Sequence, residues 1–304
     1  MVFLTEEEVA AVADLENNNI MEYQFIWQST LFLLICLALF FIAKIVFKLV
    51  NSKVNINQEL IDKDNIAFYI SYLAYFLGFV MIIGGVMKSE GSGDFWNELT
   101  LVGIYGLIGV VALNLTAIIK DKIFHSKISI WEQIVDQQKV SIGVLKGANY
   151  ISTGVIISGI MLTEVNKPIE AIVFLIFALI VSSIGFIYYN LIMPFNVRQQ
   201  IYDGNIAVSL STAGVQIAFA ILIYSGFQLT HTNWQDSLIT IGIDVLGGII
   251  ILPIIRVIVD KVFLPNRKIT DELINQDVPN LGLGLFEASA YIGGALLFVW
   301  CWNL

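Results

Sequence analysis

Four of the ionisable or strongly polar residues inside long apolar stretches of this chain are candidates for function. They are Glu287, Asp244, Lys146 and Gln216. Such side chains are costly in hydrocarbon, so those that occur there mark functional sites or bind one another. The chemistry open to them is binding or transfer of protons or cations, or hydrogen bonding between helices.

The carboxyl group of Glu287 is the strongest of these candidates. When the internal repeats described below are superimposed, it aligns with Ala74, Ala148 and Gly214, so it replaces a small residue at an expected helix contact. Two interpretations stay open. Glu287 is either a proton- or cation-responsive group, or a protonated, hydrogen-bonded residue that locks the helices together.

The other three residues have their own alternatives. Asp244 either lines an outward cavity or sits near the membrane interface in a glycine-flanked turn. Lys146 is two residues from Ala148, roughly 200° around a helix, so we expect its ammonium group to reach the headgroups. A rotated helix would instead make Lys146 a partner for Glu287. For Gln216 we favour hydrogen bonding between helices.

No motif in the sequence points to an enzyme. There is no nucleotide-binding loop, metalloprotease motif or nucleophile elbow. Cys36 and Cys301 lie in apolar runs, and His125 and His231 lie in connections far apart in sequence. We therefore expect no catalytic activity, no cofactor, no metal and no nucleic-acid partner.

Long apolar helices must position these residues. The chain is 57% hydrophobic and only 13% charged, which is typical of a multi-pass protein of the lipid bilayer. The apolar runs lack the alternation of barrel strands and predict an all-α fold. The eight expected transmembrane helices are 22–47, 66–87, 96–119, 140–162, 168–193, 206–229, 237–259 and 280–302.

A polar segment before every second helix recurs four times. The four segments begin near Gln58, Glu132, Arg198 and Asp271. Their spacing defines a repeat of roughly 70 residues, and such a fixed period indicates a duplicated structural unit. The sequence thus predicts two halves, 21–162 and 163–304, after an acidic segment, 1–20. Each repeat has two helices, so the copies are parallel and should meet around a centre along the membrane normal.

The second helix of each repeat is expected to form the inner layer. Three of these helices carry small residues four apart, a spacing that lets helix backbones approach closely. The pairs are Ala74 and Gly78, Ala148 and Ser152, and Gly214 and Ala218. The polar residues before these helices, such as Asn65 and Asn205, are expected to cap them rather than bind ions.

Basic residues predict the orientation. Thirteen of the sixteen Lys and Arg residues lie in or beside the connections after helices 1, 3, 5 and 7. The positive-inside rule then places these connections in the cytoplasm and both termini outside.

Two segments resemble a known family. Asp64-Asn65-Ile66-Ala67 and Gly204-Asn205-Ile206-Ala207, with the run from Met193 to Tyr202, resemble the YjfL-like inner-membrane proteins, which carry domain of unknown function 350. The resemblance extends from Phe40 onward, although the second and fourth copies are degenerate. Family members commonly have two repeats and four helices, so the chain is similar to a duplicated form. The resemblance implies a bacterial inner-membrane location and no established activity.

Two functions from different classes remain. The first is permeation of a small solute or ion between the parallel repeats, motivated by Glu287 and Asp244. The second is a non-enzymatic membrane scaffold that docks a soluble cytoplasmic partner in envelope maintenance. Parallel repeats are also compatible with a homo-oligomer.

Overall fold

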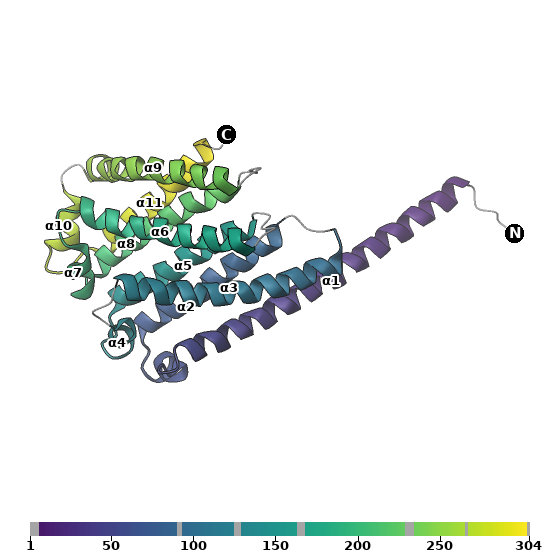
Figure 1. Cartoon of the computed structure of the whole chain (residues 1–304), viewed down its shortest axis with the longest axis horizontal. Coiled ribbons are helices and arrows are strands. Elements are labelled where there is room, and N and C mark those ends of the chain that lie inside the picture. The colour runs from purple at the N-terminus through teal and green to yellow at the C-terminus, as the bar shows by residue number, and fades with distance from the viewer. Residues whose placement is uncertain are drawn as a thin grey trace.

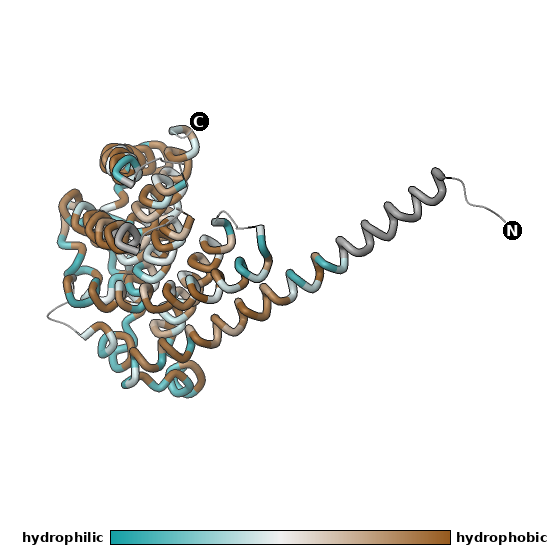
Figure 2. Tube along the Cα trace, turned by 45° about the vertical axis from the view of Figure 1, so that its right-hand side comes forward, coloured by the Kyte–Doolittle hydropathy of each residue, from teal (hydrophilic) through white to brown (hydrophobic). Residues whose placement is uncertain are grey.

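All regular elements in the described part of the chain are helices. The structure is a computed structural model that describes residues 6–89, 93–124, 129–162, 168–228, 234–264 and 267–302. In the described part of the chain, eight helices are long and apolar enough to cross a membrane, in agreement with the sequence. Figure 1 shows their arrangement, and Figure 2 shows the hydropathy of each residue along the trace. They are α1 (Glu6–Val50), α2 (Ile66–Lys88), α3 (Phe95–Phe124), α5 (Val140–Leu162), α6 (Pro168–Ile192), α8 (Ile206–Gln228), α9 (Trp234–Ile258) and α11 (Leu281–Trp302).

The first helix is longer than expected. It begins at Glu6 instead of residue 22, so its backbone takes in much of the acidic segment. That segment is rich in Glu and Ala, which have high helix propensity. The helix therefore continues beyond its apolar part.

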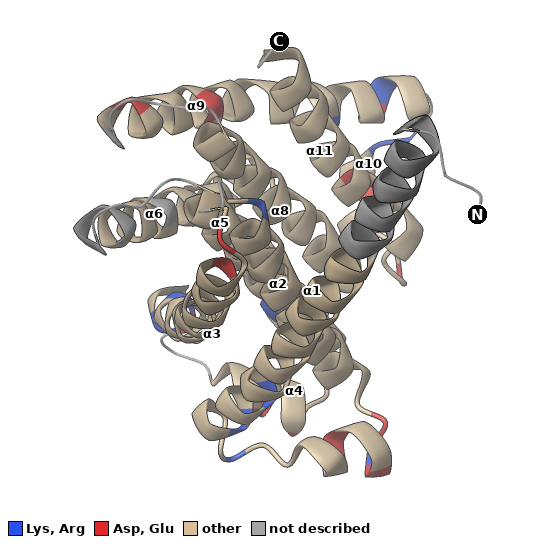
Figure 3. Cartoon of the chain, turned by 90° about the vertical axis from the view of Figure 1, so that its right-hand side faces the viewer, with Lys and Arg blue, Asp and Glu red and all other residues tan. Residues whose placement is uncertain are grey.

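The four inner helices form an open row. Helix α2 packs on α5, α5 packs on α8, and α8 packs on α11. In the described residues, α2 and α11 make no extensive contact with each other. Helices α1 and α3 flank the first half of this row, and α6 and α9 flank the second half (Figure 3). The predicted inner layer is present, but the predicted meeting of all four copies around a centre is wrong.

Helix α5 shows why the row stays open. Its face toward α2 carries Gly143 and Gly154, which lie against the backbone of Ala67 and Gly78. Its face toward α8 includes Gly159, which contacts Tyr224 and Phe227, and the same stripe carries Ala148 and Ser152. At about 100° per residue the two faces are roughly 145° apart, whereas a closed ring of four helices requires about 90°.

The second half repeats this close packing. Gly284 of α11 lies against the backbone of Ala207, and Gly214 of α8 lies against Ala288. A side chain at any of these glycines would overlap the neighbouring helix. Small residues thus allow the backbones to touch, as the sequence predicts for helix contacts in a membrane.

Short helical segments fill the polar connections and lie at one end of the bundle (Figure 1). We call them together the linker layer. Its members are η1 (Gln58–Asp62), α4 (Ile130–Val135), α7 (Val197–Tyr202) and α10 (Ile269–Ile274). A further π-helical turn, η2 (Val259–Phe263), continues α9 after Pro253.

Hydrogen bonds join each connection to the next repeat. Asn65 Oδ1 accepts from Phe68 N (3.1 Å) and caps α2, while Asn65 Nδ2 donates to the carbonyl of Ile134 (2.8 Å). Asn205 caps α8 in the same way and donates to the carbonyl of Leu273 (2.8 Å). The capping prediction is confirmed, but each asparagine also ties two repeats together.

The second and third repeats are joined by different residues at the same place. Ser141 Oγ donates to the carbonyl of Ile201 (2.7 Å), and Lys139 Nζ donates to that of Tyr202 (2.8 Å). The degenerate second copy therefore keeps the inter-repeat link while it loses the asparagine.

Candidate functional site

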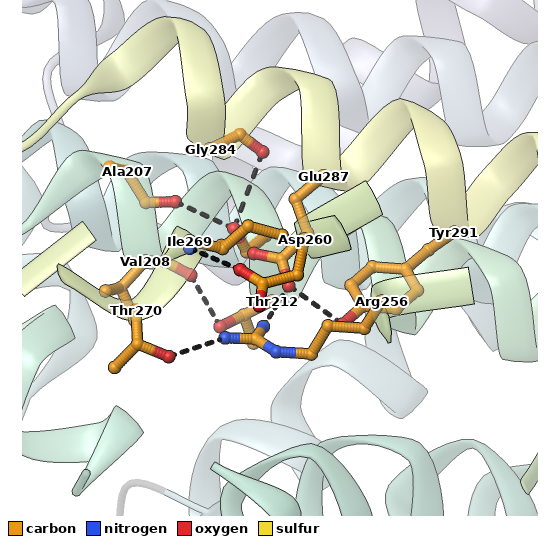
Figure 4. Close-up of polar contacts among 11 residues, drawn as sticks. Ala207, Val208, Thr212, Arg256, Asp260, Ile269, Thr270, Gly284, Glu287 and Tyr291 are labelled. Atoms are coloured by element: carbon orange, nitrogen blue, oxygen red, sulfur yellow. Dashed lines mark hydrogen bonds and ion pairs between the residues drawn. The ribbon is translucent and has the colours of Figure 1, made fainter. Parts of the chain in front are cut away.

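Glu287 of α11 is in an ion pair with Arg256 of α9 (Figure 4). Their side chains are 1% and 14% exposed, respectively. Tyr291 Oη donates to Glu287 Oε1 (2.8 Å), and Arg256 Nη2 donates to Thr270 Oγ1 (3.1 Å). The guanidinium thus joins α11 to α9 and to the linker layer.

Several polar groups surround this pair. Ser211 Oγ donates to the carbonyl of Ala207 (3.3 Å), and Asp260 Oδ1 accepts from Ile269 N (2.8 Å). Glu287 Oε2 and Tyr189 Oη are buried without a hydrogen-bond partner in the described part of the chain. One oxygen of the Glu287 carboxylate therefore receives no hydrogen bond from the described residues.

Lys146 of α5 forms a second ion pair, with Asp121 of α3 (2.5 Å). The Lys146 side chain is only 3% exposed, and its ammonium group lies 4.8 Å from the ring centroid of Tyr150. Lys146 therefore does not reach the headgroups, and it does not pair with Glu287. Both expectations fail because Asp121, on the flanking helix, supplies the counter-charge.

Lys146 and Glu287 occupy equivalent places in the two halves and carry opposite charges. Gly143 of α5 and Gly284 of α11 make the same contact in the two halves, so these two glycines are equivalent. The same register matches Lys146 with Glu287 and Tyr150 with Tyr291. The tyrosine ring faces a cation in one half, and its hydroxyl donates to an anion in the other.

The predicted alignment of Glu287 with Ala148 is thus wrong by two residues. In the first half α4 begins at Ile130 and α5 at Val140, whereas in the second half α10 begins at Ile269 and α11 at Leu281. The connection between α10 and α11 is therefore two residues longer than its counterpart. An alignment on the polar segments cannot detect that insertion.

A buried lysine lies beside the Lys146–Asp121 pair. Lys120 of α3 is 4% exposed, and its Nζ donates to Thr153 Oγ1 (3.3 Å). The adjoining cavity, between α3, α5 and α6, has a volume of about 10 Å³. A water molecule requires about 10–15 Å³ by this measure, so this space is closed to a hydrated ion.

Asp244 and Gln216 lie elsewhere. Asp244 is 1% exposed and accepts a hydrogen bond from Ser225 Oγ (2.6 Å), so its side chain is buried against α8. It is twelve residues from Arg256 along α9, which is about 18 Å. Gln216 is buried, and its Oε1 has no partner among the described residues. The structure does not bring these residues together with Glu287.

Sequence reasoning missed Asp121 because it was assigned to a polar connection, and Arg256 because it was counted only as a base beside one. A usable signal exists. Each lies near the linker end of an apolar helix, at a depth similar to that of the opposite charge on the next long helix. His125 and His231 lie outside the described residues.

Comparison with known proteins identifies the family of this chain. The model of the Domain of Unknown Function (DUF350) matches twice, at residues 20–161 and 162–302. A UPF0719 transmembrane protein of Aquifex aeolicus (strain VF5) is 22% identical over 249 residues, covering 80% of this chain and 88% of that protein. No solved structure matches the chain. With two adjacent matches that span nearly its whole length and eight membrane-crossing helices, this chain belongs to the DUF350 family of multi-pass membrane proteins, in a duplicated form.

Proposed function

We propose that this protein is a non-enzymatic membrane scaffold whose linker layer docks a soluble partner. The observation that carries this proposal is the set of hydrogen bonds that joins all four connections into one layer. A surface held in register over four repeats can present a fixed pattern of side chains. Pre-organisation of this kind lowers the entropic cost of binding.

The packing of the inner row supports the scaffold function in preference to permeation along a path between the repeats. At the α2–α5 and α8–α11 contacts, glycines lie against the neighbouring backbone. A hydrated ion could pass there only if the helices separated and lost these contacts. Close-packed interfaces resist such separation.

The exposed side chains of the linker layer suit a soluble partner. Aspartates recur along it, with apolar Ile61 and Val278 exposed beside them. The recurring exposed residues are Asp62, Asp136, Asp203 and Asp277. A basic partner surface with an apolar contact would complement this pattern. We place the layer in the cytoplasm because most Lys and Arg residues adjoin it.

Site-specific photo-crosslinking in cells tests the proposal. A crosslinker at Asp136 or Asp203 should capture one and the same soluble protein, whereas one at lipid-facing Leu246 should not. Changing Asp136 and Asp203 together to lysine should abolish capture without loss of the folded protein. Capture that is unchanged by this charge reversal would argue against the scaffold.

Permeation of an ion is the second candidate, and a different observation favours it. Glu287 Oε2 and Asp244 Oδ1 are buried within membrane spans without a partner among the described residues. Ionisable groups at such depth commonly line ion pathways. Reconstituted protein should then pass protons, K⁺ or Na⁺, and Glu287→Gln should abolish the flux while exposed Glu132→Gln should not. Wild-type protein without flux would rule out this candidate.

A further inference from the structure

A groove lies where α6 meets α7, at the edge of the membrane-spanning part. Its volume is about 270 Å³, and its lining changes along its length. Ile187 and Leu191 are apolar and exposed within the span, which ends at Ile192. The remaining lining residues are Phe186, Asn190, Asn196 and Arg198. The groove is therefore amphipathic along the direction in which a phospholipid lies.

The polar end of the groove carries an uncompensated positive charge. Arg198 is exposed and forms no ion pair among the described residues, and its guanidinium lies 5.9 Å from the ring centroid of Phe186. The nearby acid Asp203 accepts instead from Gln199 Nε2 (2.9 Å). Burial raises the pKa of Tyr202, and although Arg198 acts in the opposite direction, the hydroxyl stays neutral near pH 7. Tyr202 thus supplies no counter-charge.

Two amides adjoin this charge. The Oδ1 atom of Asn190 is buried without a partner in the described structure. Asn196 Oδ1 accepts from Gln199 N (3.0 Å), which fixes the orientation of that amide. An amide oxygen only accepts, so each asparagine can offer a phosphate oxygen only its Nδ2 donor. An arginine beside such amide donors matches the oxygens of a phosphate group.

The first half carries bases at the same place. The buried residues Leu39 and Phe47 of α1 are equivalent to the buried residues Val181 and Tyr189 of α6. The same register matches two exposed bases of α1 with groove residues of α6, namely Lys44 with Phe186 and Lys48 with Asn190. Both halves thus place positive charge beside the linker end of their first helix, by different residues.

We propose that the α6–α7 groove binds an anionic phospholipid of the leaflet that adjoins the linker layer. The phosphate lies against Arg198 and the amide of Asn190, and an acyl chain follows Ile187 and Leu191. Basic pockets between membrane helices recognise anionic headgroups by this combination of charge and apolar contact. The lipid would hold the end of α6 against α7.

Native mass spectrometry of the detergent-purified protein tests the site. Phosphatidylglycerol and phosphatidylcholine with the same chains are titrated separately against wild type, Arg198→Ala and Arg198→Lys. The control is Arg267→Ala, because Arg267 is an exposed base of the same layer outside the groove and paired with Glu272. Thermal unfolding without added lipid checks that the variants remain folded.

We expect wild type to bind one phosphatidylglycerol in preference to phosphatidylcholine. Arg198→Ala should weaken that binding by about tenfold, as loss of a charge-assisted hydrogen bond predicts. Arg198→Lys should restore part of it, and Arg267→Ala should leave it unchanged. Equal binding of both lipids, or an unchanged affinity in folded Arg198→Ala, would overturn the proposal. Displacement of the lipid by millimolar inorganic phosphate would show that the groove binds free phosphate and would also overturn it.

Discussion

Glu287 and Lys146 occupy the same place in two copies of one helix, yet they carry opposite charges. Each is neutralised by a flanking helix of its own half, Glu287 by Arg256 and Lys146 by Asp121. A buried charge is tolerable only when a partner and hydrogen bonds replace its hydration. The reversed polarity also disfavours exchange of the flanking helices between halves, because like charges would then meet.

Removing one member of the pair should cost more than removing both. Glu287→Ala leaves Arg256 buried without its counter-charge, and we expect a loss near the lower end of about 3–5 kcal/mol, since Arg256 is partly exposed. Glu287→Gln should cost less because the amide still accepts a hydrogen bond from Tyr291. The double variant Glu287→Leu with Arg256→Met should be more stable than Glu287→Ala.

Thermal unfolding in detergent measures this order. Arg267→Ala is the matched control, since it breaks an ion pair in which the arginine is 68% exposed, and it should change stability by less than about 1 kcal/mol. A double variant no more stable than Glu287→Ala would show that the pair does not act as a unit.

Asn65 combines a cap with a link between repeats. Asn65→Ala removes the acceptor for Phe68 N and leaves the buried carbonyl of Ile134 without this donor. Cap loss alone costs about 0.5–2 kcal/mol, and an unsatisfied buried carbonyl adds about 1–3 kcal/mol. Ser129→Ala, which removes only the cap of α4, is the comparison. Equal losses of thermal stability in the two variants would argue against the inter-repeat role.

At the scale of the helices, contact is set by which faces carry small residues. Gly154 lies against the backbone of Gly78, whereas Gly84 has no atom within 4 Å of the position a Cβ would take. Both glycines are in long helices and look alike in the sequence. Only the first is required for close approach.

These two glycines give a paired test of the inner row. Gly154→Ala should destabilise the protein by about 1–3 kcal/mol because the methyl group forces α2 and α5 apart. Gly84→Ala should be neutral or stabilising by up to about 1 kcal/mol, because alanine has the higher helix propensity. Unfolding temperatures in one detergent compare them, and a Gly154→Ala protein as stable as wild type would contradict the observed α2–α5 contact.

At the scale of the whole molecule, the row ends at α2 and α11. The outward face of α2 carries exposed Leu73 and Leu77. The equivalent positions of α8, which packs between two inner helices, are the partly buried Ala213 and Ile217. Leu73 is larger than Ala213, and both leucines are exposed and apolar, so the outward face of α2 is suited to lipid.

The orientation of the whole protein in the membrane is also a prediction at this scale. In a variant with Cys36 and Cys301 changed to serine, Ser52→Cys should resist an impermeant maleimide in intact cells and react after permeabilisation. Ser89→Cys, beyond the other end of α2, should react in intact cells. Labelling in the reverse pattern would place the linker layer outside. Ser92 and Ser126, natural choices from the sequence, lie outside the described residues.

Local chemistry let the sequence alone determine the eight spans, the asparagine caps and the small-residue faces. Hydrophobic length, capping and side-chain size act within a few residues of each position. These features need no knowledge of which helix lies next to which. They also sufficed to indicate the family through the segments around Asn65 and Asn205.

The tertiary structure alone decided the charge partners and the open row. The connection before α11 has two extra residues, which shift positions on that helix by roughly 200° relative to the repeat alignment. Glu287 therefore lies on a different face of α11 from the one that the alignment predicts. The counter-charges, Arg256 and Asp121, come from flanking helices that no repeat pattern places. Whether four helices close into a ring depends on the angle between the two contact faces of one helix. That angle can be derived from the sequence only when the two neighbouring helices are already known.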